Sequence, residues 1–287
     1  MTLQESAPAK VNLTLKVLGK RSDGFHQLIS LVAFASVGDV LELVPAGEIS
    51  LRVEGPFASG LGEHNLVLAA ANALLERCPG RRAGAFALDK QLPIAAGLGG
   101  GSADAAAALR LMARATPESV PGEIITAAAR QLGADVPVCL GSQACVMRGR
   151  GEQLSHVPAL PVLPAVLVNP GVVLATQQVY AALEAPALQD AHDGEADVPA
   201  SFGSADELAA YIQESGNDLE ATAIELAPVI AEVRAALHAC AGCRLAQMSG
   251  SGPTCFGIFA SADEARTAAQ IISRTHPRWW AVATQLG

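Results

Sequence analysis

The stretch LPIAAGLGGGSADAAAAL, from Leu92 to Leu109, constrains the fold of this chain more than any other. Four of the five residues from Gly97 to Gly101 are glycine, and so permissive a segment is costly inside a regular element. The alanines that follow favour a helix, because alanine has the highest helix propensity. The stretch therefore predicts a strand, a glycine-rich loop and a helix in succession.

The position of this loop before a helix indicates a phosphate site, because the N–H groups of a helix N-terminus attract anions. No lysine lies between Lys90 and Arg110, which excludes a Walker A loop. The dinucleotide pattern G-x-G-x-x-G also fails, because Ser102 and Asp104 stand where its last glycine belongs. The glycines still let the backbone approach an oligophosphate, and we expect Ser102 to cap the helix or contact Mg²⁺. The alternative is a turn that only lets helix and sheet pack closely.

Composition favours two domains with an aliphatic core. Of the 287 residues, 51% are hydrophobic but only 4% are aromatic, so leucine, valine, isoleucine and alanine must fill the core. The length suits two medium-sized domains. A proline-rich stretch near residues 155–165 predicts the boundary, which places the domains at 1–157 and 158–287.

The net charge of −9 is confined to the second half of the chain. Residues 1–155 hold 14 basic and 14 acidic side chains, whereas residues 156–287 hold 5 and 14. An acidic protein is a poor nucleic-acid binder, so we expect no nucleic-acid partner. The neutral half contains Lys10, Lys16, Lys20 and Arg21, which suit a small phosphorylated ligand.

The chain shows neither a membrane span nor an export signal. No apolar run reaches the ~20 residues that cross a bilayer, and the N-terminus lacks a charged-then-apolar pattern. We therefore expect a cytoplasmic protein with no membrane partner. The six cysteines do not require a disulfide framework there, and Cys240 and Cys243 stand without a second pair at zinc spacing. We interpret them as small hydrophobic residues beside a turn, with a metal or redox role as the alternative.

The order of elements predicts an α+β protein rather than a doubly wound sheet, because strands come early and helices later in each half. Alternating runs predict strands at 9–19, at two places within 28–46 on either side of Val37-Gly38-Asp39, at 49–55, from 84 towards the glycine loop, in a hairpin at 136–157, at 165–168, at two places within 243–260 and at 279–286. Helices are expected at 65–78 with Asn65 as N-cap, 102–115, 121–133, from about 176, 207–213, about 219–241 and from Asp263.

Three further stretches contain candidate functional residues. Asp135 in LGADVPVCL is expected between a helix and a strand, where Pro137 would hold its direction. A fixed carboxylate can accept a proton from a hydroxyl, although a single aspartate there is more often a turn residue. Lys10 in PAKVN is either a solvated edge charge or a charge aimed at a phosphate. The loop MSGSGPTCF is either a hairpin turn or a cover over phosphates or substrate.

Taken in order, these stretches resemble the GHMP kinase superfamily. The resemblance is carried by PAKVNLTLKVLGKRSDGFHQL (8–28), LPIAAGLGGGSADAA (92–106), LGADVPVCL (132–140), VNPGVVLAT (168–176), NDLE (217–220) and MSGSGPTCFGIF (248–259). The Arg-x-Asp-Gly-Phe-His segment is typical of the branch that phosphorylates a cytidine-diphosphate-linked methylerythritol. Together the stretches span nearly the whole chain.

The resemblance implies an N-terminal domain like the second domain of ribosomal protein S5 and a ferredoxin-like α/β C-terminal domain. It implies transfer of the γ-phosphoryl group of ATP, with Mg²⁺, to the 2-hydroxyl of the methylerythritol unit, a step of the non-mevalonate isoprenoid pathway. Its small-molecule partners are the cytidylyl substrate and ATP, and we expect a monomer or a weak homodimer. The alternatives are a homoserine- or mevalonate-type GHMP kinase, and a nucleotide-binding sensor without catalysis.

The resemblance also implies roles for individual residues. Asp135 matches the general base, and Lys10 matches the lysine hydrogen-bonded near it. ATP is expected at Asn65, Pro93, Ile94, Ala95, Ala96, Gly97, Leu98, Gly99, Gly100, Gly101, Ser102 and Ala103. The substrate is expected at Asn12, Phe25, His26, Thr176, Tyr180, Gly250, Ser251 and Gly252, where aromatic rings offer stacking faces for cytosine.

Two positions depart from the family pattern. Ala103 stands where members often have a second serine, so no hydroxyl is required there. Phe25 stands where others have tyrosine, so the phenol's hydrogen bond is absent. Neither departure affects Lys10 or Asp135.

Overall fold

The computed structural model describes residues 2–61, 65–79, 84–115, 119–157, 159–188 and 198–287. The chain folds into two compact units made of interleaved segments. The first unit contains Met1–Lys10, Val37–Ile94 and Gly99–Ser142, and the second contains Val11–Ser36, Ala95–Leu98 and Gln143–Gly287. The first unit lies wholly before residue 157, whereas the second draws on both sides of it. The division into segments 1–157 and 158–287 stays a prediction.

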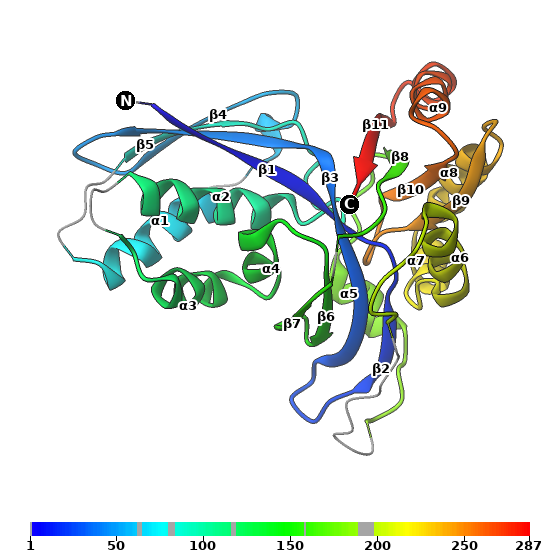
Figure 1. Cartoon of the computed structure of the whole chain (residues 1–287), viewed down its shortest axis with the longest axis horizontal. Helices are drawn as coiled ribbons and strands as arrows, with labels where there is room; N and C mark the ends of the chain where they lie inside the picture. The colour runs from blue at the N-terminus through cyan, green and yellow to red at the C-terminus, as the bar shows by residue number, and fades with distance from the viewer. Residues whose placement is uncertain (1, 62–64, 80–83, 116–118, 158, 189–197) are drawn as a thin grey trace. The chain divides into compact units, whose positions relative to one another are not determined.

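The first unit is a sheet covered by a layer of helices (Figure 1). Its strands are most of β1 (Leu3–Asn12), the second part of β3 (His26–Pro45), β4 (Ser50–Glu54) and β5 (Gly84–Asp89), with a short 3₁₀ turn η1 (Ala58–Gly60). β5 pairs antiparallel with β3 and parallel with β4. The helices are α1 (Leu66–Arg77), α2 (Gly100–Arg114), α3 (Gly122–Leu132) and α4 (Asp135–Gly141).

Helix α2 is the centre of this helical layer, because small buried side chains let its neighbours approach. The four alanines from Ala105 to Ala108 have no exposed surface, and α2 packs against α1, α3 and α4. Helix α1 begins as expected at Asn65, whose Oδ1 accepts a hydrogen bond of 2.8 Å from the Val67 N–H.

The second unit contains an antiparallel sheet in the order β11-β8-β10-β9. These strands are β8 (Leu163–Asn169), β9 (Cys243–Met248), β10 (Cys255–Phe259) and β11 (Trp280–Leu286). A second group, β2 (Lys16–Lys20), the first part of β3, β6 (Cys145–Gly149) and β7 (Gln153–His156), forms antiparallel pairs. The helices are α5 (Thr176–Ala182), α6 (Ala205–Ser215), α7 (Glu220–Leu226), α8 (Val229–His238) and α9 (Ala262–Thr275).

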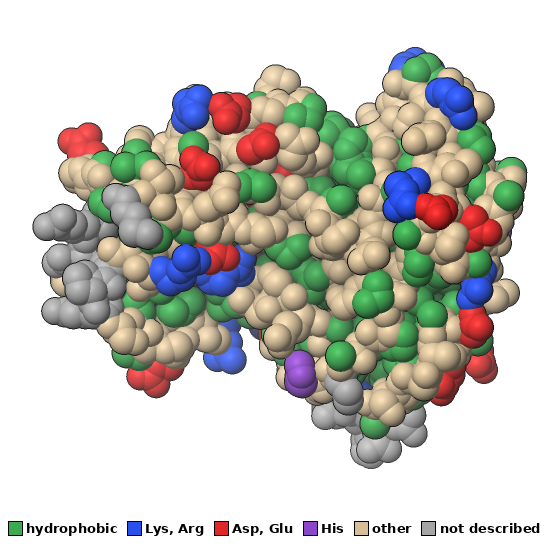
Figure 2. Space-filling model, turned by 45° about the horizontal axis from the view of Figure 1, so that its top comes forward, with side chains coloured by type: hydrophobic (Ala, Val, Ile, Leu, Met, Phe, Trp, Pro, Cys, Tyr) green, Lys and Arg blue, Asp and Glu red, His purple; other side chains and the backbone are tan. Residues whose placement is uncertain are grey.

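The core of the second unit is aliphatic, as the composition predicted. Val166 and Val168 of β8 pack in one cluster with Val233 and Leu237 of α8 and with Ile272 of α9. On the face drawn in Figure 2, charged side chains are interspersed with hydrophobic and uncharged ones. Hydrophobic side chains exposed singly are normal on a protein surface. Among the described residues, no helix combines the length and the hydrophobicity that crossing a bilayer requires.

Strand β3 runs without a break through Val37-Gly38-Asp39, where the sequence predicted a boundary between two strands. A Cβ at Gly38 would lie 2.4 Å from the Ala7 carbonyl oxygen, so the glycine allows a close approach of β1 rather than a break in the strand. Asp39 has no exposed surface, and its buried charge is compensated by an ion pair with Lys90. Val37-Gly38-Asp39 was therefore wrongly interpreted as a boundary between two strands.

Three other element predictions need correction. Residues 136–140 were expected in a strand but belong to helix α4, where Pro137 falls in the first turn and its missing N–H breaks no helical bond. The strand expected at 9–19 is two strands, β1 and β2. The helix expected at about 219–241 divides into α7 and α8 at Ala227-Pro228.

Candidate functional site

Lys10 and Asp135 form an ion pair within the first unit. Lys10 lies on β1, and Asp135 is the first residue of α4. The Lys10 Nζ and the Asp135 Oδ2 are 3.0 Å apart, and 5% of the lysine side chain is exposed against 37% of the aspartate. A buried ammonium therefore holds a carboxylate that a ligand hydroxyl can still reach. The structure brings these two candidates together, while their roles stay predictions.

The start of α2 corrects the expected capping role of Ser102. The N-cap is Gly99 with φ of 61°, which makes no side-chain capping bond, and Ser102 lies inside the first turn. The Ala103 N–H closes that turn with a 2.8 Å hydrogen bond to the Gly99 carbonyl. A Cβ at Gly99 would lie 3.2 Å from the Lys10 Cβ, so the stem of Lys10 packs against this turn. A left-handed backbone in close contact explains the glycine.

Residues Ala95–Leu98 of the same loop belong to the second unit, where they meet the loop between β9 and β10. The Ser249 hydroxyl donates a 3.2 Å hydrogen bond to the Gly97 carbonyl. A Cβ at Gly97 would lie 2.6 Å from the Gly252 carbonyl oxygen, and its φ is 73°. The two glycine-rich loops therefore support each other through backbone contacts that a side chain would disrupt.

A buried triad of Lys90, Asp39 and Asp104 lies behind the start of α2. The Lys90 Nζ is 2.5 Å from the Asp39 Oδ2 and 2.7 Å from the Asp104 Oδ2, and none of the three side chains is more than 4% exposed. The Asp39 Oδ1 also accepts hydrogen bonds from the backbone N–H groups of Gln91 and Leu92. A Cβ at Gly100 would lie 3.2 Å from the Lys90 Nζ, so the triad lies directly against this turn.

The triad has two acids for one base, which perturbs its protonation. Burial raises the pKa of Asp104 to about 7, against the lowering effect of the Lys90 charge. Burial lowers the pKa of Lys90, but the charges of Asp104 and Asp39 outweigh it and the pKa is raised overall. The Asp104 Oδ1 is buried without a hydrogen-bond partner in the structure. A proton on Asp104 would make the triad neutral, which is favourable in a buried site.

Four of the expected substrate residues line one pocket of the second unit. The cavity has a volume of about 740 Å³, and its lining includes Phe25, His26, Thr176 and Tyr180 together with Lys20, Asp23, Arg150 and Glu184. The rings of His26 and Tyr180 are 5.0 Å apart, and the Arg150 guanidinium lies 5.0 Å from the centre of the Phe25 ring. Burial and the Lys20 charge lower the pKa of His26. The pocket thus offers aromatic faces and cationic groups.

The remaining candidates, Asn12, Gly250, Ser251 and Gly252, are not part of the lining of this pocket. The Asn12 N–H donates to the Ser249 hydroxyl at 3.1 Å, and the Asn12 side-chain amide donates to the Ser30 hydroxyl at 2.7 Å. A Cβ at Gly250 would lie 3.1 Å from the Asn12 Oδ1. Ser251 and Thr176 share a hydrogen bond of 2.8 Å, which joins the β9–β10 loop to the pocket.

The family models match both halves of this architecture. GHMP kinases N terminal domain matches residues 65–143, and GHMP kinases C terminal matches residues 195–278. The 4-diphosphocytidyl-2-C-methyl-D-erythritol kinase of a Methylorubrum extorquens strain is 51% identical over 287 residues, which cover 99% of each chain. The chain belongs to the 4-diphosphocytidyl-2-C-methyl-D-erythritol kinase family. The protein of that name in a Rhodopseudomonas palustris strain is also 51% identical, with 99% of each chain covered.

Solved structures agree with this family. A crystal structure of 4-(cytidine 5'-diphospho)-2C-methyl-D-erythritol kinase has a TM-score of 0.79 at 37% identity and covers 99% of each chain. A homoserine kinase from Cytophaga hutchinsonii has a TM-score of 0.70 at 21% identity and covers 99% of this chain and 94% of its own, which shows a shared fold alone. The expected GHMP kinase fold is confirmed, and the chain is an ATP-dependent small-molecule kinase. The homoserine and mevalonate alternatives are less well supported than the cytidylyl branch.

Metal ligands and thiols complete the inventory of reactive groups. Within the described ranges, no three His, Cys, Asp or Glu side chains gather as a metal site. The six cysteines are free thiols. Cys240 is buried beside a turn closed by the Cys243 N–H, and burial raises the pKa of the Cys243 thiol to about 11. The interpretation as small residues beside a turn therefore agrees with the structure, although Cys243 is only half-buried.

Four residues with a supporting or pocket-lining role were missed at the level of sequence. Lys90 follows directly after β5, and Asp104 and Arg110 interrupt the alanine-rich helix α2. Charged residues in an otherwise small and apolar helix are a signal of buried pairing, because an unpaired buried charge is costly. Arg150 carried no such signal, since it follows a strand in a hairpin turn.

Proposed function

We propose that this kinase transfers the γ-phosphoryl group of ATP to the 2-hydroxyl of 4-diphosphocytidyl-2-C-methyl-D-erythritol, an isoprenoid precursor, with Asp135 as general base. The single observation that carries the proposal is the ion pair between buried Lys10 and partly exposed Asp135. Phosphoryl transfer depends on positioning and charge stabilisation more than on covalent chemistry. A fixed, reachable carboxylate beside a buried cation supplies both.

In this proposal Asp135 accepts the proton of the attacking 2-hydroxyl. Lys10 keeps the carboxylate in one orientation through the 3.0 Å contact and offsets negative charge on the reacting groups. A positioned general base contributes typically 10²–10⁴-fold to a rate. Because the Lys10 side chain is buried against the Gly99 turn, its rotamer is restricted.

The start of α2 is proposed to hold the ATP phosphates. Two observations support this. The helix begins with a glycine turn at Gly99, and its N-cap makes no side-chain capping bond. The first N–H groups of the helix are therefore available to bind an anion. Mg²⁺ in kinases is bound by substrate phosphates and one or two hard oxygen ligands. The hydroxyl of Ser102 in the first turn of α2 is an oxygen donor of that kind.

The pocket of the second unit is proposed to bind the cytidylyl part of the substrate. Phe25 and Tyr180 offer ring faces, and stacking on aromatic side chains is worth about 1–3 kcal/mol per base. Lys20 and Arg150 bring positive charge to the same pocket, which suits a diphosphate. Cytoplasmic location and a monomeric or weakly dimeric state stay predictions.

The decisive experiment measures ADP release by a coupled assay with 4-diphosphocytidyl-2-C-methyl-D-erythritol, homoserine and mevalonate as acceptors. Turnover of the first compound alone is expected. In Asp135→Asn we expect kcat to fall by about 10²–10⁴-fold while ATP still binds in calorimetry. Asp218→Asn is the matched control, because that aspartate pairs with Lys16 in the second unit. Near-native kcat in Asp135→Asn would remove Asp135 from the role of base, and ATP binding without turnover of any acceptor would favour a sensor.

A further inference from the structure

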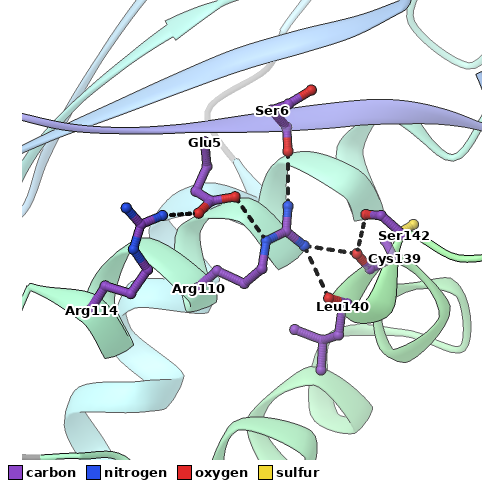
Figure 3. A network of polar contacts seen from close by, with 7 residues as sticks. All are labelled: Glu5, Ser6, Arg110, Arg114, Cys139, Leu140 and Ser142. Atoms are coloured by element: carbon purple, nitrogen blue, oxygen red, sulfur yellow. Dashed lines mark hydrogen bonds and ion pairs between the residues drawn. The ribbon is translucent and has the colours of Figure 1, made fainter. Parts of the chain in front are cut away.

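Arg110 of helix α2 connects three elements of the first unit through a single guanidinium (Figure 3). Its Nε donates to the Glu5 Oε2 at 3.1 Å, and its Nη2 donates to the Ser6 carbonyl at 2.8 Å. Its Nη1 donates to the carbonyls of Cys139 at 2.8 Å and Leu140 at 3.3 Å. The side chain therefore joins α2 to β1 and to the last turn of α4.

The two elements that Arg110 joins are those of the Lys10–Asp135 pair. Lys10 follows Ser6 by four residues on β1, and Asp135 precedes Cys139 by four residues on α4. Helix α4 has seven residues, and its N-cap Ala134 makes no side-chain capping bond. A helix of this length is only marginally stable by itself, so its position in the fold depends on the contacts that other elements make with its ends.

Arg110 makes such contacts with the C-terminal end of α4. Helix C-termini leave carbonyl groups without intrahelical partners, and a cation there also suits the helix dipole. The Cys139 carbonyl accepts a second bond from the Ser142 hydroxyl at 3.0 Å, which completes the network in Figure 3. Arg110 alone in this network reaches from α4 across to β1.

We propose that Arg110 is a positioning residue that fixes helix α4 onto strand β1 and thereby aligns the Asp135 carboxylate with Lys10. The proposal rests on the roles proposed above for Lys10 and Asp135. The planar guanidinium serves three directions at once, which a lysine ammonium on a flexible stem does not reproduce. A displacement of about 1 Å at a reacting group can cost ~10²-fold in rate.

The chain offers a matched control in Arg114, one turn further along α2. Arg114 also pairs with Glu5, through the Oε1 atom, and 54% of its side chain is exposed. In the described structure its ion pair is directed to β1 and not to α4. Substitution of Arg114 therefore removes a cation from Glu5 while the contacts to Cys139 and Leu140 remain.

The test compares Arg110→Met, Arg110→Lys and Arg114→Met at a temperature well below the unfolding midpoint of each. We expect Arg110→Met to lower kcat by about 10–100-fold with KM values for ATP and acceptor within about twofold. Arg110→Lys should recover only part of that loss, and Arg114→Met should stay within about twofold of the unmodified kinase. A role in folding alone would lower the melting temperature without this split between kcat and KM.

A double variant distinguishes the positioning role of Arg110 from the roles proposed for Lys10 and Asp135. If Arg110 acts by aligning Asp135 with Lys10, Arg110→Met should lower the residual kcat of Lys10→Ala by less than twofold. Without the Lys10 ammonium there is no ion pair left for Arg110 to align. Equal losses in Arg110→Met and Arg114→Met, or an unchanged kcat in folded Arg110→Met, would overturn the positioning role. If Asp135→Asn keeps its turnover, the proposed base has failed, whereas loss in Asp135→Asn with none in Arg110→Met refutes the positioning role alone.

Discussion

Replacement of Lys90 by methionine is expected to destabilise the first unit severely, because it leaves two buried carboxylates without their cation. Lys90 and the side chains of Asp39 and Asp104 are 2%, 0% and 4% exposed. The substitution removes two charge-assisted hydrogen bonds, each worth roughly 1.5–3 kcal/mol. Breaking a buried ion pair by removal of one partner costs about 3–5 kcal/mol, which agrees with the estimate from the two hydrogen bonds. We therefore expect a loss of about 3–5 kcal/mol in the free energy of unfolding.

The assay is urea unfolding followed by circular dichroism at pH 8 and at pH 5. The loss should be smaller at pH 5, because protonation of the unpaired carboxylates removes the buried charge. Arg52→Met is the control, since its ion pair with Glu54 is 71% and 53% exposed and such pairs contribute less than about 1 kcal/mol. Lys90→Met combined with Asp104→Asn should recover at least about 1 kcal/mol of the loss.

Two outcomes would refute this reasoning. One is a loss in Lys90→Met no larger than that in Arg52→Met, which would mean that the triad contributes little. The other is an equal loss at pH 5 and pH 8, which would mean that buried charge is not its cause. A folded Lys90→Met variant should also bind ATP more weakly, because Lys90 lies against the start of α2 at Gly100 and a change of its side chain disturbs that turn.

Three further predictions concern the loop, the triad and the pocket. Gly99→Ala should raise KM for ATP and cost about 1–2 kcal/mol in urea unfolding, because it forces a left-handed residue against Lys10; unchanged values would contradict this. The pKa of Asp104 is raised by burial from 3.8 to about 7, so its contribution to stability is full below about pH 4 and is lost as pH rises through 7. Asp104→Asn should therefore flatten the pH dependence of urea unfolding between pH 5 and 8, and an unchanged slope would show that this carboxyl is not its source. Arg150→Ala should raise KM for the cytidylyl substrate about 3–10-fold with little change in kcat, whereas Arg148→Ala outside the pocket lining should not.

Local sequence signals were sufficient where a single residue decides the local structure. Asn65 begins α1 as predicted, because a cap needs only its own side chain and the next N–H groups. The alanine-rich helix and the strands around the Ser249–Gly252 loop were predicted for similar reasons. The family resemblance implied that the side chains of Lys10 and Asp135 lie close together, and the structure places them 3.0 Å apart.

Signals failed where a distant contact overrides local preference. Gly38 was interpreted as part of a break between two strands, but its missing side chain makes room for the Ala7 carbonyl of another strand. Asp39 belonged to the same predicted break, although its carboxylate pairs with Lys90, which lies 51 residues away. Arg110 also binds atoms far from it in sequence, so its role is visible only in three dimensions.

The interleaved path of the chain limits how a protein of this architecture can change over generations. The first unit ends at Ser142, while the second already includes Val11–Ser36 and Ala95–Leu98. A single recombination event cuts a gene at one point, and no point yields two products that each contain a whole unit. Exchange of one whole unit by a single crossover is therefore closed to this chain.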